Sequence, residues 1–137
     1  MNTAELGKFL EPGRIAVVAT LRRDGFPHLV PVWYLFDGES ILIWTDKTRA
    51  WPKNVMRDGR VALSVQDDRP PFAALVLRGR AEVFDQADDA GYQMAKDISA
   101  RYIGEDAADD YVKPWWPKLH TFVRITPDKI TSWDRGY

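Results

Sequence analysis

The sequence contains no cysteine, which excludes disulfides, thiolate nucleophiles and cysteine-ligated metals. It holds only two histidines, His28 and His120, and neither has carboxylate neighbours at metal-ligand spacing, so no metal site is expected. No apolar run approaches the ~18 residues that a membrane-spanning helix needs. No basic and then apolar leader opens the chain. We therefore expect a cytoplasmic protein without a membrane partner.

The chain also lacks an excess of charge of either sign. Its 19 basic and 20 acidic residues give a net charge of −1, whereas general nucleic-acid binders usually have a strong basic balance. No nucleic-acid partner is expected, and any anion site must be local. No nucleophile with a neighbouring base stands out, so no catalytic residue is assigned. If the protein is an enzyme, a bound cofactor must supply its reactivity.

Short β-branched runs separated by Asp-Gly turns predict a mainly β fold in one domain spanning residues 1–137. Pro31 predicts an edge strand or a bulge, and Gly79 predicts a bend or bulge that curls the sheet. We expect the first three strands to form an antiparallel meander and the last two a hairpin across Pro127-Asp128. Strands are predicted over 14–22, 28–36, 41–45, 60–66, 72–84, 120–126 and 129–133, helices over 48–58 and 85–104, and a connection over 105–119. The result is a six- to seven-stranded, mainly antiparallel barrel with two helices.

The segment TDKTRAWPKNVMRDGR, residues 45–60, concentrates basic side chains in a nearly neutral chain. Helical spacing places Arg49, Lys53 and Arg57 on one face, opposite a packing seam of Trp51 and Val55. A helix N-terminus favours an anion, and Thr45, Lys47 and Thr48 lie near it in sequence. Two interpretations stay open from the residues alone: a solvated cationic face, or a seat for a phosphate ester.

The run RIAVVATLRRDGFPHLVPVWYLFDGESILIWTDKTRAWPKNVMRDGRVALSVQDD, followed by LRGRAEV and FVRITPDKITSWD, resembles the flavin/deazaflavin split-barrel superfamily. These are the pyridoxamine-phosphate-oxidase-like proteins, and the sequence is most similar to short members that use coenzyme F420. The resemblance covers residues 10–134. The chain departs from many relatives at Trp51-Pro52, which separates Arg49 from Lys53.

The resemblance implies a split barrel that forms a homodimer, with a cofactor site in each groove between subunits. It places the cofactor ring against the second strand and Trp44, the phosphate against the basic segment, and groups from the fourth and fifth strands in the partner's site. Trp115 and Trp116 are expected on the substrate side, and Tyr34 is a candidate proton donor. The implied cofactor-binding residues are Val30, Pro31, Val32, Trp33, Trp44, Thr45, Lys47, Arg49, Lys53, Asn54, Gln66 and Arg78.

The activity that the resemblance implies is hydride transfer from reduced F420 to a small electron-poor organic acceptor. F420 carries a polyglutamate tail, for which Arg57 and Arg60 would be further contacts. An FMN-binding oxidase or flavin reductase of the same fold is the first alternative, because FMN also presents a ring, a ribityl chain and a phosphate. A non-catalytic protein that binds F420, haem or another tetrapyrrole is the second.

Overall fold

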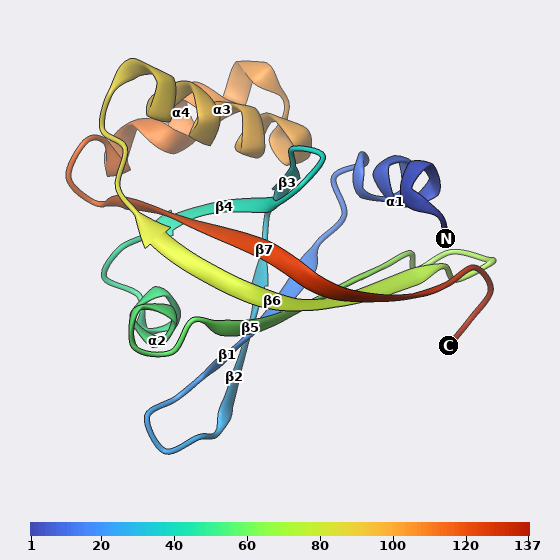
Figure 1. The fold of residues 1–137 in the computed structure, drawn as a ribbon. Coiled ribbons are helices and arrows are strands. Elements are labelled where there is room, and N and C mark those ends of the chain that lie inside the picture. The colour runs from blue at the N-terminus through green and yellow to red at the C-terminus, as the bar shows by residue number, and fades with distance from the viewer.

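The computed structural model describes all residues from 1 to 137, and its centre is a curved antiparallel sheet (Figure 1). This sheet is a half-barrel of seven strands accompanied by four α-helices. The elements in chain order are α1 (Thr3–Leu10), β1 (Ala16–Leu21), β2 (Pro27–Val32), β3 (Leu35–Phe36), β4 (Ile41–Asp46), α2 (Ala50–Arg57), β5 (Arg60–Gln66), β6 (Ala74–Phe84), α3 (Asp89–Ile103), α4 (Glu105–Val112), the 3₁₀ turn η1 (Lys113–Trp115) and β7 (His120–Trp133).

The strand order is β2-β1-β5-β6-β7-β4-β3, so β2 and β3 are the two edges of the sheet. The edge position predicted from Pro31 is confirmed. Both Asp-Gly connections of the predicted meander join antiparallel neighbours, β1 with β2 and β3 with β4. The meander is not continuous, however, because β4 pairs with β3 and β7 and not with β2. The strand predicted over 28–36 is interrupted at Trp33 and Tyr34, where the chain crosses from one end of the sheet to the other. The side chain of Tyr34 is fully buried there, which holds this crossing against the core.

The predicted hairpin across Pro127-Asp128 is also wrong, because β7 runs unbroken from His120 to Trp133 along β6. The pairing shifts register there: Arg78 pairs with Lys129 and Gly79 with Pro127, which leaves Asp128 as an extra residue. A bulge tolerates proline, which cannot donate to the ladder. The bend or bulge predicted at Gly79 is confirmed by this register shift between Arg78 and Gly79. A Cβ on Gly79 would clash with the Thr126 carbonyl oxygen.

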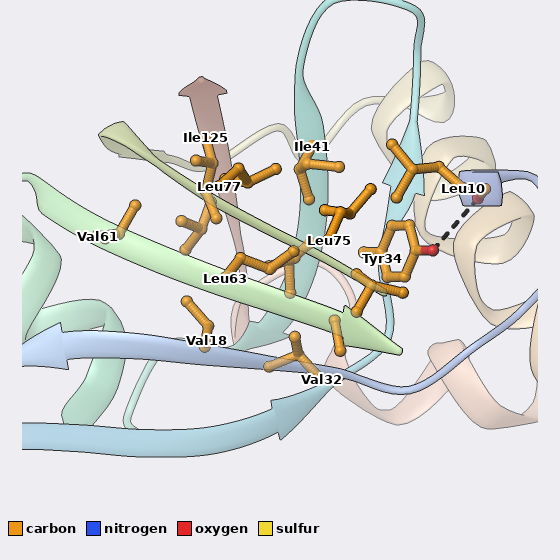
Figure 2. Close-up of a cluster of buried hydrophobic side chains, with 14 of the residues drawn as sticks. Leu10, Val18, Val32, Tyr34, Ile41, Val61, Leu63, Leu75, Leu77 and Ile125 are labelled. Carbon is orange, nitrogen blue, oxygen red and sulfur yellow. Dashed lines mark hydrogen bonds between the residues drawn. The ribbon is translucent and has the colours of Figure 1, made fainter. Parts of the chain in front are cut away.

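The main core fills the concave side of the half-barrel with aliphatic side chains from most of the strands, as Figure 2 shows. Trp51 and Val55 of α2 join this core, which confirms the packing seam predicted for the basic segment. At the other end of the core, the Tyr34 hydroxyl donates a hydrogen bond to the Leu10 carbonyl at the end of α1 (3.3 Å).

A second, smaller core lies between the outer side of β4 and β7 and the helices α3 and α4 (Figure 1). Sequence reasoning predicted α3 but treated residues 105–119 as a connection, and so missed α4. Gly104 does end α3, with φ +84°, but the chain resumes a helix immediately after it. Ala108 and Val112, four residues apart, bury one face of α4. No helix in the structure has the length and apolar character to cross a membrane.

Candidate functional site

A groove of about 190 Å³ opens where the sheet fails to close. One side is the free edge of β2, with Val30, Pro31, Val32 and the following Trp33. The other is the part of β4 beyond its short pairing with β3, from Ile43 to Asp46. Each of these strand segments has a partner on one side only. Backbone N–H and C=O groups on both edges therefore lack a strand partner and remain available to a ligand.

Four aromatic side chains form one wall of the groove: Trp33, Trp44, Tyr111 and Trp115. The Tyr111 ring lies centrally, with its centroid 5.1 Å from that of Trp33 and 5.9 Å from those of Trp44 and Trp115. Trp33 in turn stacks on Tyr102 of α3 at 4.9 Å with an interplanar angle of 9°. This aromatic wall is supported from behind by α3 through the stacking of Trp33 on Tyr102.

The opposite end of the groove is polar and contains Thr45, Asp46 and Arg49. The Asp46 carboxylate accepts hydrogen bonds from the Thr48 backbone N–H (2.9 Å) and hydroxyl (2.8 Å). The backbone hydrogen bond is the largest influence that lowers the pKa of Asp46 below its usual range. Arg49 is the exposed N-cap residue of α2, and its guanidinium makes no hydrogen bond or ion pair within the chain, although its charge helps to lower the pKa of Asp46. Its guanidinium is thus free for an anion.

The five basic residues of the segment 45–60 do not act as one stripe. Lys47 pairs with Asp85 (2.6 Å) and Arg60 with Asp58 (2.8 Å). Arg57 donates to the Leu21 carbonyl oxygen. Only Arg49 and Lys53 are left without a partner. The proposed seat for an anion therefore narrows to these two residues at the N-terminal half of α2, where Trp51 and Pro52 between them are both buried.

The structure brings seven of the residues implied by the resemblance to the groove: Val30, Pro31, Val32, Trp33, Trp44, Thr45 and Arg49. Lys47 and Lys53 lie close by in sequence but do not line it. Asn54 lies on the buried side of α2, where its amide nitrogen is 3.1 Å from Thr20 Oγ1 and 3.2 Å from His28 Nδ1. It is not brought to the groove.

Gln66 and Arg78 belong to β5 and β6, away from the groove of the same chain. Arg78 is exposed and 3.5 Å from Asp128. The expected contribution of these two residues to a partner's site stays a prediction.

The aromatic residues outside β2 and β4 differ in their relation to the groove. Trp115 lines the groove, as the resemblance implied, whereas Trp116 stacks on His120 with centroids 3.8 Å apart and does not reach it. Tyr34 is excluded as a proton donor in the groove, because its hydroxyl points to Leu10. Sequence reasoning missed Tyr111. The signal was available, since Tyr111 and Trp115 are four residues apart on the same side of α4 and η1 as a helix would place them.

The sequence profile of the family described as pyridoxamine 5'-phosphate oxidase matches residues 3–134. The chain belongs to this family. None of the curated proteins matches the chain in sequence.

Several solved structures are similar to this chain. A conserved hypothetical protein of Mycobacterium tuberculosis is 30% identical over 98% of this chain and 85% of its own, with a TM-score of 0.83. An F420 reductase is 26% identical over 90% of this chain and 94% of its own, with a TM-score of 0.70. HutZ, the heme storage protein of Vibrio cholerae, is 13% identical over 97% and 95%, with a TM-score of 0.75, and so shares the fold.

The groove fits the type of cofactor that a pyridoxamine 5'-phosphate oxidase-like fold implies. A flat heteroaromatic ring matches the aromatic wall, and its polar atoms match unpaired main-chain groups on two strand edges. A phosphate matches the Thr45 hydroxyl and the unpartnered Arg49. The negative charge of Asp46 would repel an anion there, although its Oδ1 already accepts two hydrogen bonds from Thr48. The site is compatible with a flavin or a deazaflavin.

Proposed function

We propose that this protein is an oxidoreductase that binds reduced coenzyme F420 in the groove between β2 and β4 and passes hydride to a small, electron-poor organic acceptor. The observation that carries the proposal is Arg49, a cation without a partner at the polar end of a slot walled by aromatic rings. The 26% identity to an F420 reductase over 90% of the chain supports F420 as the cofactor.

In this proposal, F420 supplies the hydride, and the protein supplies placement. Arg49 and the Thr45 hydroxyl hold the phosphate, with Lys53 one turn further along α2. Main-chain groups at Val30 to Val32 orient the ring, while Trp33 and Trp115 exclude water from one side of it. Holding donor and acceptor at near-attack distance contributes up to roughly 7–11 kcal/mol in favourable cases. The proton for the product comes from solvent or from Tyr111, a residue that is 41% exposed and whose hydroxyl has no partner.

FMN is the competing cofactor, and one observation favours it. Arg57 and Arg60, the residues expected to meet the polyglutamate tail of F420, are engaged with the Leu21 carbonyl and Asp58. Fewer cations are therefore available than the sequence suggested, and a single phosphate would be enough to pair with the two that remain, Arg49 and Lys53. The fold likeness to a heme storage protein adds no comparable support. His120 is not free as a haem ligand, because both of its ring nitrogens are within hydrogen-bond distance of backbone groups.

We also propose that the protein acts as a homodimer in which the partner completes the groove. The cavity of about 190 Å³ is smaller than the ~300–1,000 Å³ of a complete small-molecule site. The outer face of the sheet carries a row of uncharged residues across five strands, paired in register: Pro31, Val17, Ser64, Val76 and Thr131. Leu29 beside this row is 64% exposed. Such a face is a suitable surface for a second copy.

The test of the activity is the oxidation of reduced F420 by a panel of quinone, nitroaromatic and enone acceptors, followed by the return of the oxidised deazaflavin's absorbance. Enzyme-dependent oxidation with at least one acceptor supports the reductase. Tight binding of F420 without turnover on any acceptor would instead identify a binding protein. A chromophore that co-purifies with the protein and has the mass of FMN would assign FMN.

A further inference from the structure

We propose that Ser99, a residue of α3 outside the groove, is a positioning residue that fixes the orientation of Trp44 in the groove wall. Trp44 donates from its indole Nε1 to the Ser99 hydroxyl oxygen at 2.9 Å. Ser99 is fully buried, and its hydroxyl donates to the Ala95 carbonyl oxygen at 2.8 Å. The inference rests on the proposed function only in that the groove must receive a ligand.

The direction of these hydrogen bonds leaves little freedom. An indole N–H is only a donor, and a serine hydroxyl has one proton to give. Because that proton goes to Ala95, the Ser99 oxygen can only accept from Trp44. Rotation of the indole away from Ser99 would leave its N–H without this acceptor in a half-buried position, which is unfavourable. Trp44 is therefore held by a partner that the ligand does not touch.

The fixed indole determines what the groove offers a ligand. With its N–H turned toward α3, Trp44 presents carbon atoms rather than a donor to the groove. Its ring meets Tyr111 and Trp115 nearly edge-on, at interplanar angles of 78° and 71°. The wall accordingly favours a flat ring with an apolar face at this point. Loss of the bond to Ser99 would allow the indole to turn and would loosen this selection.

A double-mutant cycle between Ser99→Ala and Trp44→Phe tests the proposal, because coupling energies isolate a pairwise interaction. The probes are F420 and FMN, and the measured quantity is the Kd of each. We expect Ser99→Ala alone to weaken the binding of the better ligand about 3- to 10-fold, the range of one ordinary hydrogen bond. In the Trp44→Phe background, the same substitution should have no further effect. Equal weakening in both backgrounds would overturn the proposal, since Ser99 would then act through the packing of α3.

A readout without ligand separates this inference from the proposed function. The tryptophan emission and near-UV circular dichroism of the free protein should change with Ser99→Ala, but not when Trp44 is already phenylalanine. If the wild-type protein binds neither F420 nor FMN, the proposed function fails, while these spectra still decide the role of Ser99. An unchanged spectrum in the Ser99→Ala variant would overturn it.

Two further variants serve as a control and as a substitute in this experiment. Ser40→Ala is the matched control, because Ser40 is also buried and its hydroxyl donates to Asp37 at 2.8 Å, with no contact to the groove. It should change neither the spectra nor the Kd. If Ser99→Ala does not fold, Ser99→Cys replaces it, since sulfur keeps a similar volume but is a weak acceptor. Ser99→Cys should shift the emission in the same direction, and wild-type emission in this variant would count against the proposal.

Discussion

The ammonium nitrogen of Lys47 lies 2.6 Å from Asp85 Oδ2, whereas Arg49, two residues later, has no partner. The ion pair links the end of β4 to the segment before α3 and makes Lys47 less available to a bound anion. The pair is the largest influence that lowers the pKa of Asp85. Two neighbouring cations that look equivalent in the sequence thus have different expected roles.

Arg49→Gln should weaken the binding of F420 or FMN more than Lys47→Gln does. A hydrogen bond to a charged group contributes about 1.5–3 kcal/mol, which corresponds to roughly a 10- to 150-fold rise in Kd. Lys53→Ala should have a smaller effect than Arg49→Gln, because Lys53 does not line the groove. Calorimetric titration of each variant measures these differences. Lys129→Ala, on β7 and away from the groove, is the control; losses equal to that of Arg49→Gln would contradict the phosphate site.

Asp46→Asn should strengthen binding of the same anionic ligands. The hydrogen bonds from Thr48 hold the pKa of Asp46 below its usual range, so the carboxylate stays charged at neutral and mildly acidic pH. Removing a like charge near a surface site changes the free energy by about 1 kcal/mol or less, up to roughly fivefold in Kd. Calorimetric titration of both proteins at pH 7 measures the ratio of wild-type to variant Kd. A weaker-binding Asp46→Asn variant would show that Asp46 contributes to binding.

His120 should make the stability of the fold depend on pH. Burial lowers its pKa, and the neutral ring donates from Nδ1 to the Pro117 carbonyl and accepts from the Gln86 N–H at Nε2. The unfolded chain binds a proton at a higher pH than the folded protein does. The contribution is therefore complete above the unfolded pKa of about 6.5 and is lost progressively as the pH falls below it.

Urea denaturation between pH 8 and 5 measures this dependence, and His120→Gln should flatten it. NMR titration of the two histidines gives the same answer without a substitution. A His120 resonance that titrates at or above the usual histidine value would contradict the prediction.

Gly79→Ala should destabilise the protein by about 1–3 kcal/mol or more, the usual cost of forcing extra volume into a packed site. The added Cβ would meet the backbone of Thr126 and Pro127, which cannot move without disturbing the β6–β7 ladder. Thermal denaturation measures the loss. Gly7→Ala is the control, because nothing lies within 4 Å of a Cβ at that position. Equal stability of both variants would contradict the close approach at the bulge.

Val17→Glu should convert a dimer to a monomer and weaken cofactor binding together with it. Val17 is 38% exposed in the single chain and lies between Pro31 and Ser64 in the uncharged row on the outer face. In the proposed dimer, a glutamate at this position would face the same charge of the partner or would be buried in an apolar contact, and both are unfavourable. Light scattering gives the mass, and the Kd for F420 is measured on the same samples. A wild-type monomer, or a variant that stays dimeric, would refute this interface.

Local sequence patterns predicted those parts of the fold that depend on local chemistry. β-branched runs marked most strands, Gly79 marked the bulge, and the four-residue spacing of Trp51 and Val55 marked the seam of α2. Pairing between distant segments was beyond such patterns. Nothing local distinguishes a β4 that pairs with β2 from one that pairs with β7, and Pro127-Asp128 has the same turn chemistry in a hairpin as in a bulge.

The residues that line the groove were only partly predictable from the sequence. Family resemblance placed Val30 to Trp33, Trp44, Thr45 and Arg49 together, and in the structure these residues line one cavity. It did not reveal that Asp85, Asp58 and Leu21 take up three of the five cations, because those partners come from other elements or depend on side-chain geometry. Tyr111 was missed because the acidic run before it hid an amphipathic helix.

The most direct test of the account is a titration of F420 and FMN, each separately, into the wild-type protein while tryptophan fluorescence is followed. Trp33, Trp44 and Trp115 line the groove, so a bound ring should quench their emission. We expect saturable quenching by both ligands, with the lower Kd for F420. If neither F420 nor FMN quenches the emission, the result would contradict a cofactor site between β2 and β4.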